Sequence, residues 1–397
     1  MNNSSKTVLF ISHDSSNSGA PIFLLRFLSW FRKQRTTPFR ILIGQAGGLL
    51  PDFESLAPAD LFEPKATPLQ EILRRLGWAR KADNSRHLAL LRQKLSESNI
   101  GLIYSNTIVN GHILDFLSFL NCPVICHVHE LQYAIGNAGE ENLKLIKKYT
   151  SSYIAVSHAV KRNLIENLGI PAERIRTIHG FIPIDATENK INDSGTDVRR
   201  ELGISRGARL VGACGTIEPR KGVDLFLRVA NRVKELYKAD PVHFLWVGGW
   251  PREVRRARKD ARSLSVQDIV HFIGRRPNVN AYYDASDIFL LPSREDPFPL
   301  VMLEAAWRGK PVICFDDTGG APEFVEHDAG FVVPKFDVDE MAKKVIELLD
   351  RNELRERLGE TAKNKVANLH GLNAGGPKIA DCIEEVLTSG TRQYARP

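Results

Sequence analysis

The sequence predicts an α/β protein built from two doubly wound, Rossmann-like domains. Three observations support this prediction. The length of 397 residues favours more than one domain. Short apolar runs alternate with helical stretches along the chain, and the alternation stops in a polar segment before it begins again. Apolar runs bounded by turns and separated by helices indicate parallel strands covered on both faces. Because such sheets bind ligands at the carboxyl ends of their strands, we expect the two domains to face each other across a ligand cleft.

The first half of the chain carries five predicted strands with helices between them. The strands are Val8–Ser12, Phe39–Gly44, Leu102–Ser105, Val124–His129 and Tyr153–Ser157. The helices are Pro21–Gln34, Ile108–Leu120 and His158–Leu168. This order is typical of βαβ units.

A polar stretch at 185–205 predicts a linker with a short helix, and the alternation then restarts. The second set of strands is Leu210–Ala213, Phe244–Val247, Val270–Ile273, Ile288–Leu291 and Val312–Phe315. Helices are predicted at Val223–Tyr237 and Leu300–Arg308, and two helical segments close the chain. We therefore predict a first domain at 1–184, a linker at 185–205, a second domain at 206–372, and a final helix within 373–397 that crosses back to the first domain.

Composition and cysteine usage favour a protein kept inside the cell. Hydrophobic residues make up 43% and charged residues 25%, which is ordinary for a globular protein. Apolar stretches fall short of the ~20 residues needed to span a bilayer. The polar N-terminus leads directly into a strand, unlike a signal peptide. The five cysteines are mostly isolated, which is typical of buried thiols in a reducing compartment rather than of a zinc site. We expect a cytoplasmic location.

The net charge of +7 favours anionic partners. Basic residues gather at Gln70–Lys94 and at Pro251–Arg262, and a solvated helical face is the commoner cause of such runs. The segment Ala20–Arg35 is apolar with cations at its end. It is usually read as a crossover helix, but together with residues 70–94 it leaves open a peripheral contact with the inner face of a membrane. No basic region shows the aromatic interleaving expected of a protein that binds single-stranded nucleic acid, so nucleic acid is not expected as a partner.

Two segments of the second half carry the chemistry. In Ser293–Ala306 a strand gives way to a turn containing Asp296, and a helix containing Glu304 opens near Leu300. The first N–H groups of a helix are unpaired and attract phosphate. In Gly212–Gly222 glycines allow close approach of a ligand, and two adjacent cations could neutralise a departing diphosphate. The two segments together predict a site for a nucleoside diphosphate.

These residues resemble a known family. The segments Gly215–Gly222, Phe272–Gly274 and Asp296–Ala305 look like the donor half of retaining GT-B-fold glycosyltransferases, the large group that includes sucrose synthase and bacterial mannosyltransferases. In the first half the resemblance extends to Ser12-His13, Gly19-Ala20, His127–Glu130 and Ala155–His158. It implies a hexosyltransferase of polysaccharide biosynthesis, which moves a sugar from a nucleotide diphosphate sugar to a glycan or lipid-linked acceptor with retention of configuration. The resemblance implies no cofactor and no metal.

The resemblance also implies roles for individual residues. Lys221, assisted by Arg220, pairs with the donor phosphates, and the amides of Leu300 and Val301 meet the pyrophosphate. Glu304 binds the ribose hydroxyls, and Asp296 contacts hydroxyls of the transferred sugar. The first-domain histidine that faces this sugar corresponds to His129. The remaining donor-binding residues implied by the resemblance are Gly19, Gly215, Thr216, Gly274, Arg275 and Phe298.

Four positions depart from the family pattern. Asp296 stands where the family usually has Glu, and Thr216 stands where it usually has Arg. Pro299 replaces a common Gly and offers no N–H. Pro21 stands where an acidic residue often follows the Gly-Ala pair. These departures leave the reaction class unchanged and the donor sugar open.

Other functions stay open from the sequence alone. An inverting GT-B transferase or a nucleotide-sugar epimerase would use the same segments, and a degenerate, non-catalytic protein could bind an anionic ligand with them. The sequence His127-x-His129-Glu130 also suggests a metal site. His127 and His129 alternate along a predicted strand and so point to one face of the sheet, unlike a zinc pair on a helix. We predict no metal here.

Overall fold

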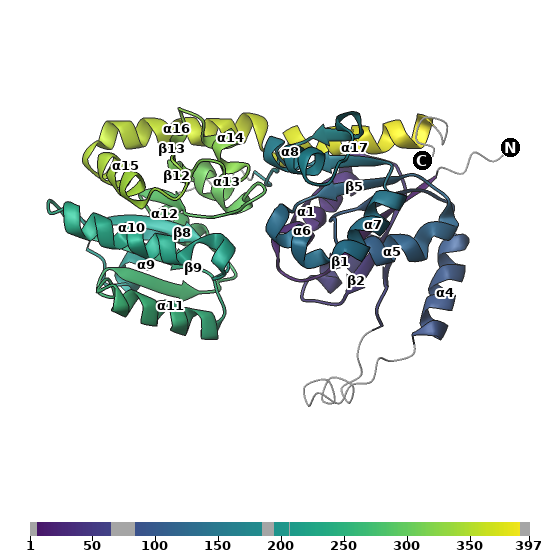
Figure 1. Cartoon of the computed structure of the whole chain (residues 1–397), viewed down its shortest axis with the longest axis horizontal. Coiled ribbons are helices and arrows are strands. Elements are labelled where there is room, and N and C mark those ends of the chain that lie inside the picture. Colours follow the sequence, from purple (N-terminus) through teal and green to yellow (C-terminus); the bar gives the residue numbers. More distant parts are fainter. Residues whose placement is uncertain (1–5, 65–83, 185–193, 206, 390–397) are drawn as a thin grey trace. The chain divides into compact units, whose positions relative to one another are not determined.

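The computed structural model describes residues 6–64, 84–184, 194–205 and 207–389. The described chain forms two compact units. The N-terminal unit comprises the chain up to Val156, residues Val160–Ile178, and the C-terminal part from Gly376 onward. The C-terminal unit comprises Ser157–Ala159 and His179–Gly375. Figure 1 shows both units coloured along the chain.

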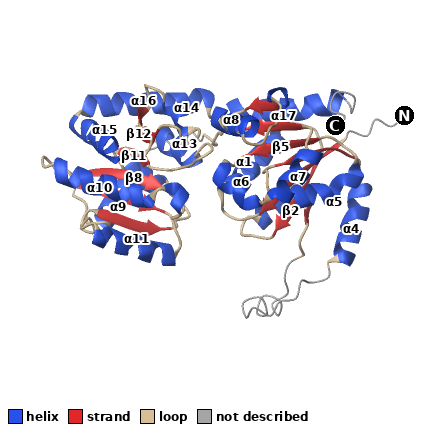
Figure 2. Cartoon of the chain, in the orientation of Figure 1, coloured by secondary structure: helices blue, strands red, loops and turns tan. Residues whose placement is uncertain are grey.

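The N-terminal unit is built on a seven-stranded parallel sheet with strand order β3-β2-β1-β4-β5-β6-β7. Its strands are β1 Thr7–Asp14, β2 Phe39–Gln45, β3 Ala59–Leu61, β4 Ile100–Ser105, β5 Val124–Val128, β6 Ser152–Ala155 and β7 Ile175–Thr177. Its helices are α1 Gly19–Gln34, α2 Leu50–Leu56, α4 Ser85–Ser96, α5 Gly111–Phe116, α6 Gln132–Ala138, α7 Glu140–Tyr149 and α8 His158–Glu166, followed much later by α17 Leu372–Ser389. Figure 2 shows these helices surrounding the strands.

The centre of this unit is the packing of α1 on β1. Residues 8–11 of β1 are fully buried, as expected of a central strand covered on both faces. The ring of Phe10 lies 6.1 Å from that of Phe27 and 5.8 Å from that of Phe31. The aromatic side chains of α1 therefore pack against the sheet. Of the two interpretations of the segment 20–35, the structure shows the crossover helix, with its apolar side chains turned to the core instead of to lipid. Residues 70–83 of the neighbouring basic run lie outside the described residues.

The C-terminal unit is built on a six-stranded parallel sheet with strand order β10-β9-β8-β11-β12-β13. Its strands are β8 Arg209–Cys214, β9 Val242–Val247, β10 Val270–Gly274, β11 Ile288–Leu291, β12 Val312–Phe315 and β13 Gly330–Val333. Its helices are α9 Ser194–Glu201, α10 Val223–Leu236, α11 Pro251–Ser263, α12 Asn280–Ala285, α13 Leu300–Trp307, α14 Ala321–Val325, α15 Val338–Asp350 and α16 Asn352–Leu369. The two parallel α/β sheets confirm the predicted fold class.

The borders between the units differ from those expected. The break in the first half falls after Ile178, ahead of the expected 184, because Ile182 pairs with Gly371 and thereby belongs to the C-terminal unit. Residues 194–205, expected within the linker, also join that unit, because Val198 and Ile204 are buried in a cluster with Leu210 of β8. Residues 185–193 of the expected linker lie outside the described part of the chain.

The end of the chain also differs in detail. After Phe315 the sequence suggested two helical segments and no further strand. The structure adds strand β13, and three helices, α15, α16 and α17, follow it. From Gly376 onward α17 groups with the N-terminal unit, where Arg35 pairs with Glu384 and Arg176 with Glu385. Helix α17 thus supplies charged partners to α1 and β7.

A search of the described helices for a membrane-spanning segment finds none that is both long and apolar enough.

Candidate functional site

The strand order of the C-terminal unit determines where its two chemical segments meet. The chain runs from β8 outward to β9 and β10, then returns to β11 on the other side of β8. The carboxyl ends of β8 and β11 therefore flank the point where the strand order reverses, and ligands bind doubly wound sheets at that point. The segment Gly215–Lys221 follows β8 and the segment Pro292–Pro299 follows β11. The topology brings the two predicted segments to one edge of the sheet.

An ion pair between Lys221 and Asp296 joins the two segments. The Nζ atom of Lys221 lies 2.5 Å from Oδ2 of Asp296, and the Asp296 side chain is only 7% exposed. The hydroxyl of Ser293 donates to the same carboxylate oxygen over 3.4 Å. A buried carboxylate needs such partners, because an unpaired buried charge is costly.

The Asp296 backbone is held as firmly as its side chain. Its N–H donates to the carbonyl of Thr318 over 2.7 Å, and its own carbonyl accepts from Gly320 N–H over 3.1 Å. Gly319, between these partners, has φ +132°, and a Cβ atom there would lie 1.8 Å from the Asp296 carbonyl oxygen. Only glycine fits this close approach.

Arg220 lies beside the same pair. Its Nη1 is 3.8 Å from Oδ1 of Asp296 and donates to the carbonyl of Glu295 over 3.1 Å. Its Nη2 donates to Glu218 over 2.7 Å. The exposed Thr216 hydroxyl donates to Glu218 as well, over 2.9 Å. Arg220 thus places a second cation beside Lys221 at this edge of the sheet. The uncharged Thr216 supplies none.

The glycine turn after β8 brings the backbone close to Lys221. A Cβ atom on Gly215 would lie 3.6 Å from the Lys221 side chain. Gly222 has φ +69°, and a Cβ atom there would lie 2.0 Å from the carbonyl oxygen of Pro292. A larger residue at Gly222 would therefore push the two segments apart.

Glu304 lies on α13 and is held by a tyrosine of α12. The buried hydroxyl of Tyr283 donates to Oε2 of Glu304 over 3.2 Å. Burial raises the pKa of Tyr283 well above its ordinary value, so the phenol keeps its proton and remains a donor. Cys214, at the end of β8, contacts this pair, and burial raises the pKa of its thiol to about 11. The sequence reasoning missed both Tyr283 and Cys214.

The start of α13 is open as expected. Leu300 and Val301 form its first turn after Pro299, and within the described residues no backbone acceptor takes their N–H groups. Helix N-termini carry a partial positive charge, which favours anions. Pro299 itself has no N–H to offer.

The remaining predicted donor contacts of this unit are spread more widely. Phe298 is 6% exposed, and its ring stacks on His370 at 5.3 Å, which indicates packing. Gly274 accepts from Gly248 N–H over 2.9 Å at the ends of β10 and β9. Next to it, the Arg275 guanidinium lies 4.2 Å from the ring centre of Trp250. Trp250, which is 56% exposed, was not singled out from the sequence.

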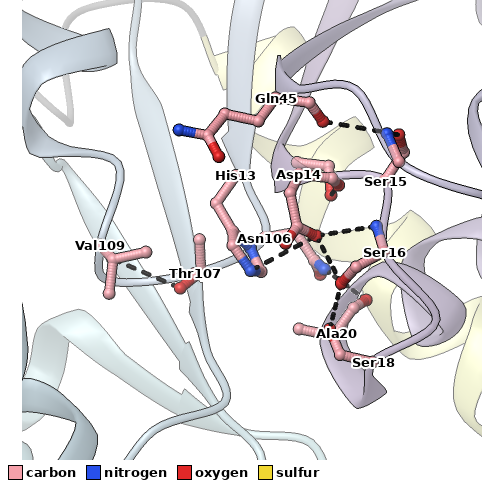
Figure 3. A network of polar contacts seen from close by, with 12 residues as sticks. His13, Asp14, Ser15, Ser16, Ser18, Ala20, Gln45, Asn106, Thr107 and Val109 are labelled. Carbon is pink, nitrogen blue, oxygen red and sulfur yellow. Dashed lines mark hydrogen bonds and ion pairs between the residues drawn. The ribbon is translucent and has the colours of Figure 1, made fainter. Parts of the chain in front are cut away.

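The N-terminal sheet has a reversal point of its own, between β1 and β4. Asp14, at the end of β1, accepts from the backbone N–H of Ser16 over 3.0 Å and from its hydroxyl over 2.9 Å (Figure 3). His13 Nε2 lies 3.6 Å from Asp14. After β4, the Asn106 amide donates to the carbonyl of Ala20 over 2.7 Å (Figure 3). Polar contacts from both strands therefore hold the start of α1, where Gly19 is exposed with nothing within 4 Å of a Cβ atom.

His129 follows β5 at the same edge. Its ring lies 4.2 Å from that of His127, which confirms that the two side chains share one face. Its Nε2 is 3.1 Å from Oδ1 of Asn106, and its ring lies 5.0 Å from that of Phe23. Burial, with the neighbouring His13 as a smaller cause, lowers the pKa of His129 to about 3. His129 is therefore neutral at physiological pH.

The Glu130 carboxylate makes its hydrogen bonds to backbone and hydroxyl groups, not to the two histidine rings. It accepts hydrogen bonds from the Thr107 hydroxyl and from the N–H groups of Ile108 and His129. Burial raises the pKa of Glu130 to about 7, and these hydrogen bonds lower it in part. These hydrogen bonds to Glu130 stabilise the loop after β4.

Among the described residues, metal-ligating atoms converge outside the His127–Glu130 segment, where we predict no metal. The side chains of His158, His179 and Glu323 bring one ligand atom each within 4.8 Å of one another. The Glu323 carboxylate is already engaged there: it accepts from the N–H groups of His158 and Ala159 and from His179 Nε2, each over 2.8 Å. All of these residues belong to the C-terminal unit.

Comparison with known families agrees with this geometry. Residues 195–365 match the family described as glycosyl transferases group 1, and residues 55–186 match Glycosyltransferase Family 4.

Individual relatives point the same way. An uncharacterized glycosyltransferase of Haemophilus influenzae is 31% identical over 144 residues, 36% of this chain and 40% of the relative. The N-acetyl-alpha-D-glucosaminyl L-malate synthase of Bacillus anthracis is 32% identical over 214 residues, 53% of this chain and 54% of the relative. These alignments thus span about half the length of the curated relatives.

Among solved structures, Anabaena Alr3699/HepE in complex with UDP and glucose superimposes with a TM-score of 0.76 and 20% identity, covering 95% of this chain and 99% of the other. At this identity the likeness concerns the fold. Two family matches follow one another along the chain, on two parallel α/β sheets of this topology. The C-terminal half of the chain is thus similar to the glycosyl transferases group 1 and the N-terminal half to Glycosyltransferase Family 4, and the fold is that of the GT-B structures.

Proposed function

We propose that this protein is a hexosyltransferase that moves a sugar from a nucleoside diphosphate to a glycan or lipid-linked acceptor with retention of configuration. The observation that carries the proposal is the cluster of Lys221 and Arg220 beside the open first turn of α13. Two cations and unpaired amides at one edge of a doubly wound sheet suit a diphosphate.

The chemistry asked of this edge is charge stabilisation. When the bond between the anomeric carbon and the phosphate lengthens, negative charge grows on the departing diphosphate and the sugar becomes cationic. Lys221, Arg220 and the amides of Leu300 and Val301 stabilise that negative charge without a metal ion. Hydrogen bonds to charged groups contribute about 1.5–3 kcal/mol each, and a well-placed donor contributes about 10²–10³ in rate.

Asp296 sets the position of Lys221 before the donor arrives. The ion pair keeps the lysine ammonium at the edge of the sheet. When the donor binds, its phosphate becomes a second anion for the same lysine, and Asp296 accepts from hydroxyls of the transferred sugar.

The nucleoside is held by Glu304 of α13 and by residues at the end of β10. Glu304 accepts from the ribose hydroxyls, and the Tyr283 hydroxyl fixes the orientation of its carboxylate. Gly274 and Arg275 border the base, with Trp250 under the guanidinium of Arg275.

His129 acts on the transferred sugar as a neutral hydrogen-bonding group. With a pKa of about 3 it carries no charge at neutral pH, so it adds no charge of its own beside an oxocarbenium-like sugar. Its bond to Asn106 fixes the orientation of the ring.

The acceptor class is what the resemblance to the family implies. One relative is named N-acetyl-alpha-D-glucosaminyl L-malate synthase, and one similar structure is a complex with UDP and glucose. They support a nucleotide sugar as donor, and we place this chain in polysaccharide or glycoconjugate biosynthesis.

Release of nucleoside diphosphate tests the proposal. Purified protein is incubated with UDP-, GDP- and ADP-hexoses in the presence of EDTA, and the released diphosphate is measured with and without candidate acceptors. We expect slow hydrolysis of one donor without acceptor, and a retained anomeric configuration in the transferred product by NMR.

The rival functions give other results. An inverting transferase gives the opposite anomer, and an epimerase returns an intact nucleotide sugar with an altered hexose. Binding of a nucleotide sugar without any turnover would indicate a non-catalytic protein and would contradict the proposal.

A further inference from the structure

Helix α11, Pro251–Ser263, carries an exposed row of cations that the proposed reaction leaves unused. We call Arg252, Arg255, Arg256, Lys259 and Arg262 the basic stripe. All five side chains are exposed, and within the described residues none of them has an ion-pair partner. Arg258, the sixth cation of the helix, is excluded because it donates to the carbonyl of Phe272 over 2.7 Å.

The helical period places the basic stripe on one face. At about 100° per residue its five positions fall within an arc of roughly 120°. The buried residues Val254, Ala257 and Ala261 lie on the opposite side and pack on the core. The acidic residues Glu253 and Asp260 lie to one flank of the stripe, and Glu253 accepts from the N–H of Trp250 as part of the helix cap. The stripe therefore has a single sign of charge.

Several cations on other helices of the same unit are paired. Lys234 of α10 pairs with Asp268 at 3.1 Å, and Arg232 of α10 pairs with Asp339 at 2.7 Å. Lys344 of α15 pairs with Glu347 at 2.9 Å. Like charges three and four residues apart repel one another on a helix, so an uncompensated stripe is destabilising until an anionic partner binds.

We propose that the basic stripe docks the C-terminal unit on a membrane surface rich in anionic phospholipid. The charge is complementary, and the stripe runs about 15 Å along the exposed face of the helix, which suits a flat surface. No aromatic side chain lies among the five cations, so the stripe lacks the stacking platform that single-stranded nucleic acid needs.

The contact is electrostatic rather than inserted. The apolar residues of α11 are already buried, so the helix has no apolar face left for the hydrocarbon. Binding should therefore fall steeply as salt screens the charges.

The placement of α11 connects this surface to the donor edge within the same unit. Three residues separate the end of β9 from the start of α11. One of them, Gly248, lies against the glycine turn after β8, since a Cβ atom there would lie 2.1 Å from the carbonyl oxygen of Gly215. The inference stands apart from the proposed function, because it concerns binding to vesicles and uses no turnover.

Vesicle co-sedimentation of the full chain tests it. The probes are vesicles of phosphatidylcholine alone and of phosphatidylcholine with a quarter phosphatidylglycerol, each at 50 and 500 mM NaCl. One variant changes the five stripe residues to Gln. The matched control changes five exposed cations elsewhere in the same unit to Gln: Arg228, Lys238, Lys343, Arg351 and Arg357.

We expect the wild type to bind only the anionic vesicles and to be released at high salt. The stripe variant should bind at least tenfold more weakly, while the control, which loses the same five charges, should stay within about threefold of the wild type. Circular dichroism and thermal melts establish that both variants fold. If the stripe variant unfolds, R255Q/K259Q/R262Q replaces it, with an intermediate loss expected.

Three outcomes would overturn the proposal. The wild type could fail to bind anionic vesicles, the stripe variant and the control could lose binding equally, or a single-stranded oligonucleotide at equal charge concentration could displace the protein from vesicles. The last outcome would assign the stripe to nucleic acid.

Discussion

The carboxyl edges of the two sheets occupy the same topological position but carry opposite chemistry. In the N-terminal unit the reversal point lies between β1 and β4, and nearby His127 and His129 are kept neutral by burial. In the C-terminal unit it lies between β8 and β11, where Lys221 and Asp296 form an ion pair. One architecture thus presents an edge with neutral histidines, which we call the neutral edge, and an edge with this ion pair, which we call the charged edge.

The difference shows that burial and ion pairing give two similar domains different chemistry. Desolvation without a counter-ion removes the charge of a buried histidine. On the other edge, Lys221 and Asp296 are held in place by their ion pair. The charged edge suits the anionic diphosphate, and the neutral edge suits hydroxyl groups. Substitutions on the two edges should therefore have separable effects.

Removing the lysine should give the largest effect. Lys221→Ala is expected to lower kcat/KM at least tenfold and up to about 10³-fold, because it removes a charged donor from the departing diphosphate. Steady-state kinetics measure this loss, with Arg228→Ala on the exposed face of α10 as a control of equal charge change. A rate for Lys221→Ala that matches the control would remove the phosphate role from this residue.

Removing the histidine should affect the rate and leave donor affinity unchanged. His129→Ala is expected to lower kcat about 10–100-fold, since it deletes one hydrogen bond to the reacting sugar. The affinity for the nucleoside diphosphate should stay within about twofold. His112→Ala, in the same unit, is the control. If nucleotide affinity fell together with kcat, the division between the two edges would be wrong.

The Tyr283 hydroxyl allows a finer test of the charged edge. Tyr283→Phe should weaken nucleoside diphosphate binding about 3–10-fold, because the Glu304 carboxylate loses a bond that orients it. It should also narrow the difference in affinity between the ribonucleotide and its 2′-deoxy analogue. Tyr282→Phe is the matched control, since its hydroxyl accepts from Arg276 Nε over 2.9 Å instead. Unchanged discrimination in Tyr283→Phe would leave that tyrosine with a packing role alone.

The smallest effect concerns the pH dependence of stability at the neutral edge. The pKa of Glu130 is raised from 4.5 to about 7 in the folded protein, so the folded state holds a proton that the unfolded chain releases in that range. The stabilisation from Glu130 is therefore complete below pH 4.5 and is lost as the pH rises through 7.

Glu130→Gln cannot titrate and should lack this loss. Urea denaturation at pH 4.5 and at pH 7.5 should show the free energy of unfolding falling between the two, by on the order of 1 kcal/mol more in the wild type than in the variant. The histidines change the stability of both proteins in the opposite direction, so only the difference between the two counts. Parallel curves for wild type and variant would contradict the raised pKa.

The sequence was informative wherever one local signal sufficed. The run Val8–Ile11 is apolar throughout and forms a central strand, and Leu300 opens a helix after a proline-rich turn. The proximity of Lys221 and Asp296 was also accessible. They are far apart in sequence, but parallel topology brings the carboxyl ends of β8 and β11 together.

What the sequence could not give depends on tertiary partners. Strand β3 has three residues, and its assignment comes from pairing with β2 rather than from its own pattern. The unit border at Ile178 follows from the pairing of Ile182 with Gly371. The contact between Tyr283 and Glu304 arises where α12 packs near α13, and no spacing rule along the chain encodes it.

The central claim is that the charged edge of the C-terminal unit holds a nucleoside diphosphate without a metal ion. Calorimetric titration of UDP, GDP and ADP into the purified protein in EDTA tests it most directly. We predict saturable binding of at least one of the three, weakened at least tenfold by Lys221→Ala and left within about twofold by His129→Ala. No binding of any of the three, or binding that is indifferent to Lys221, would contradict the claim.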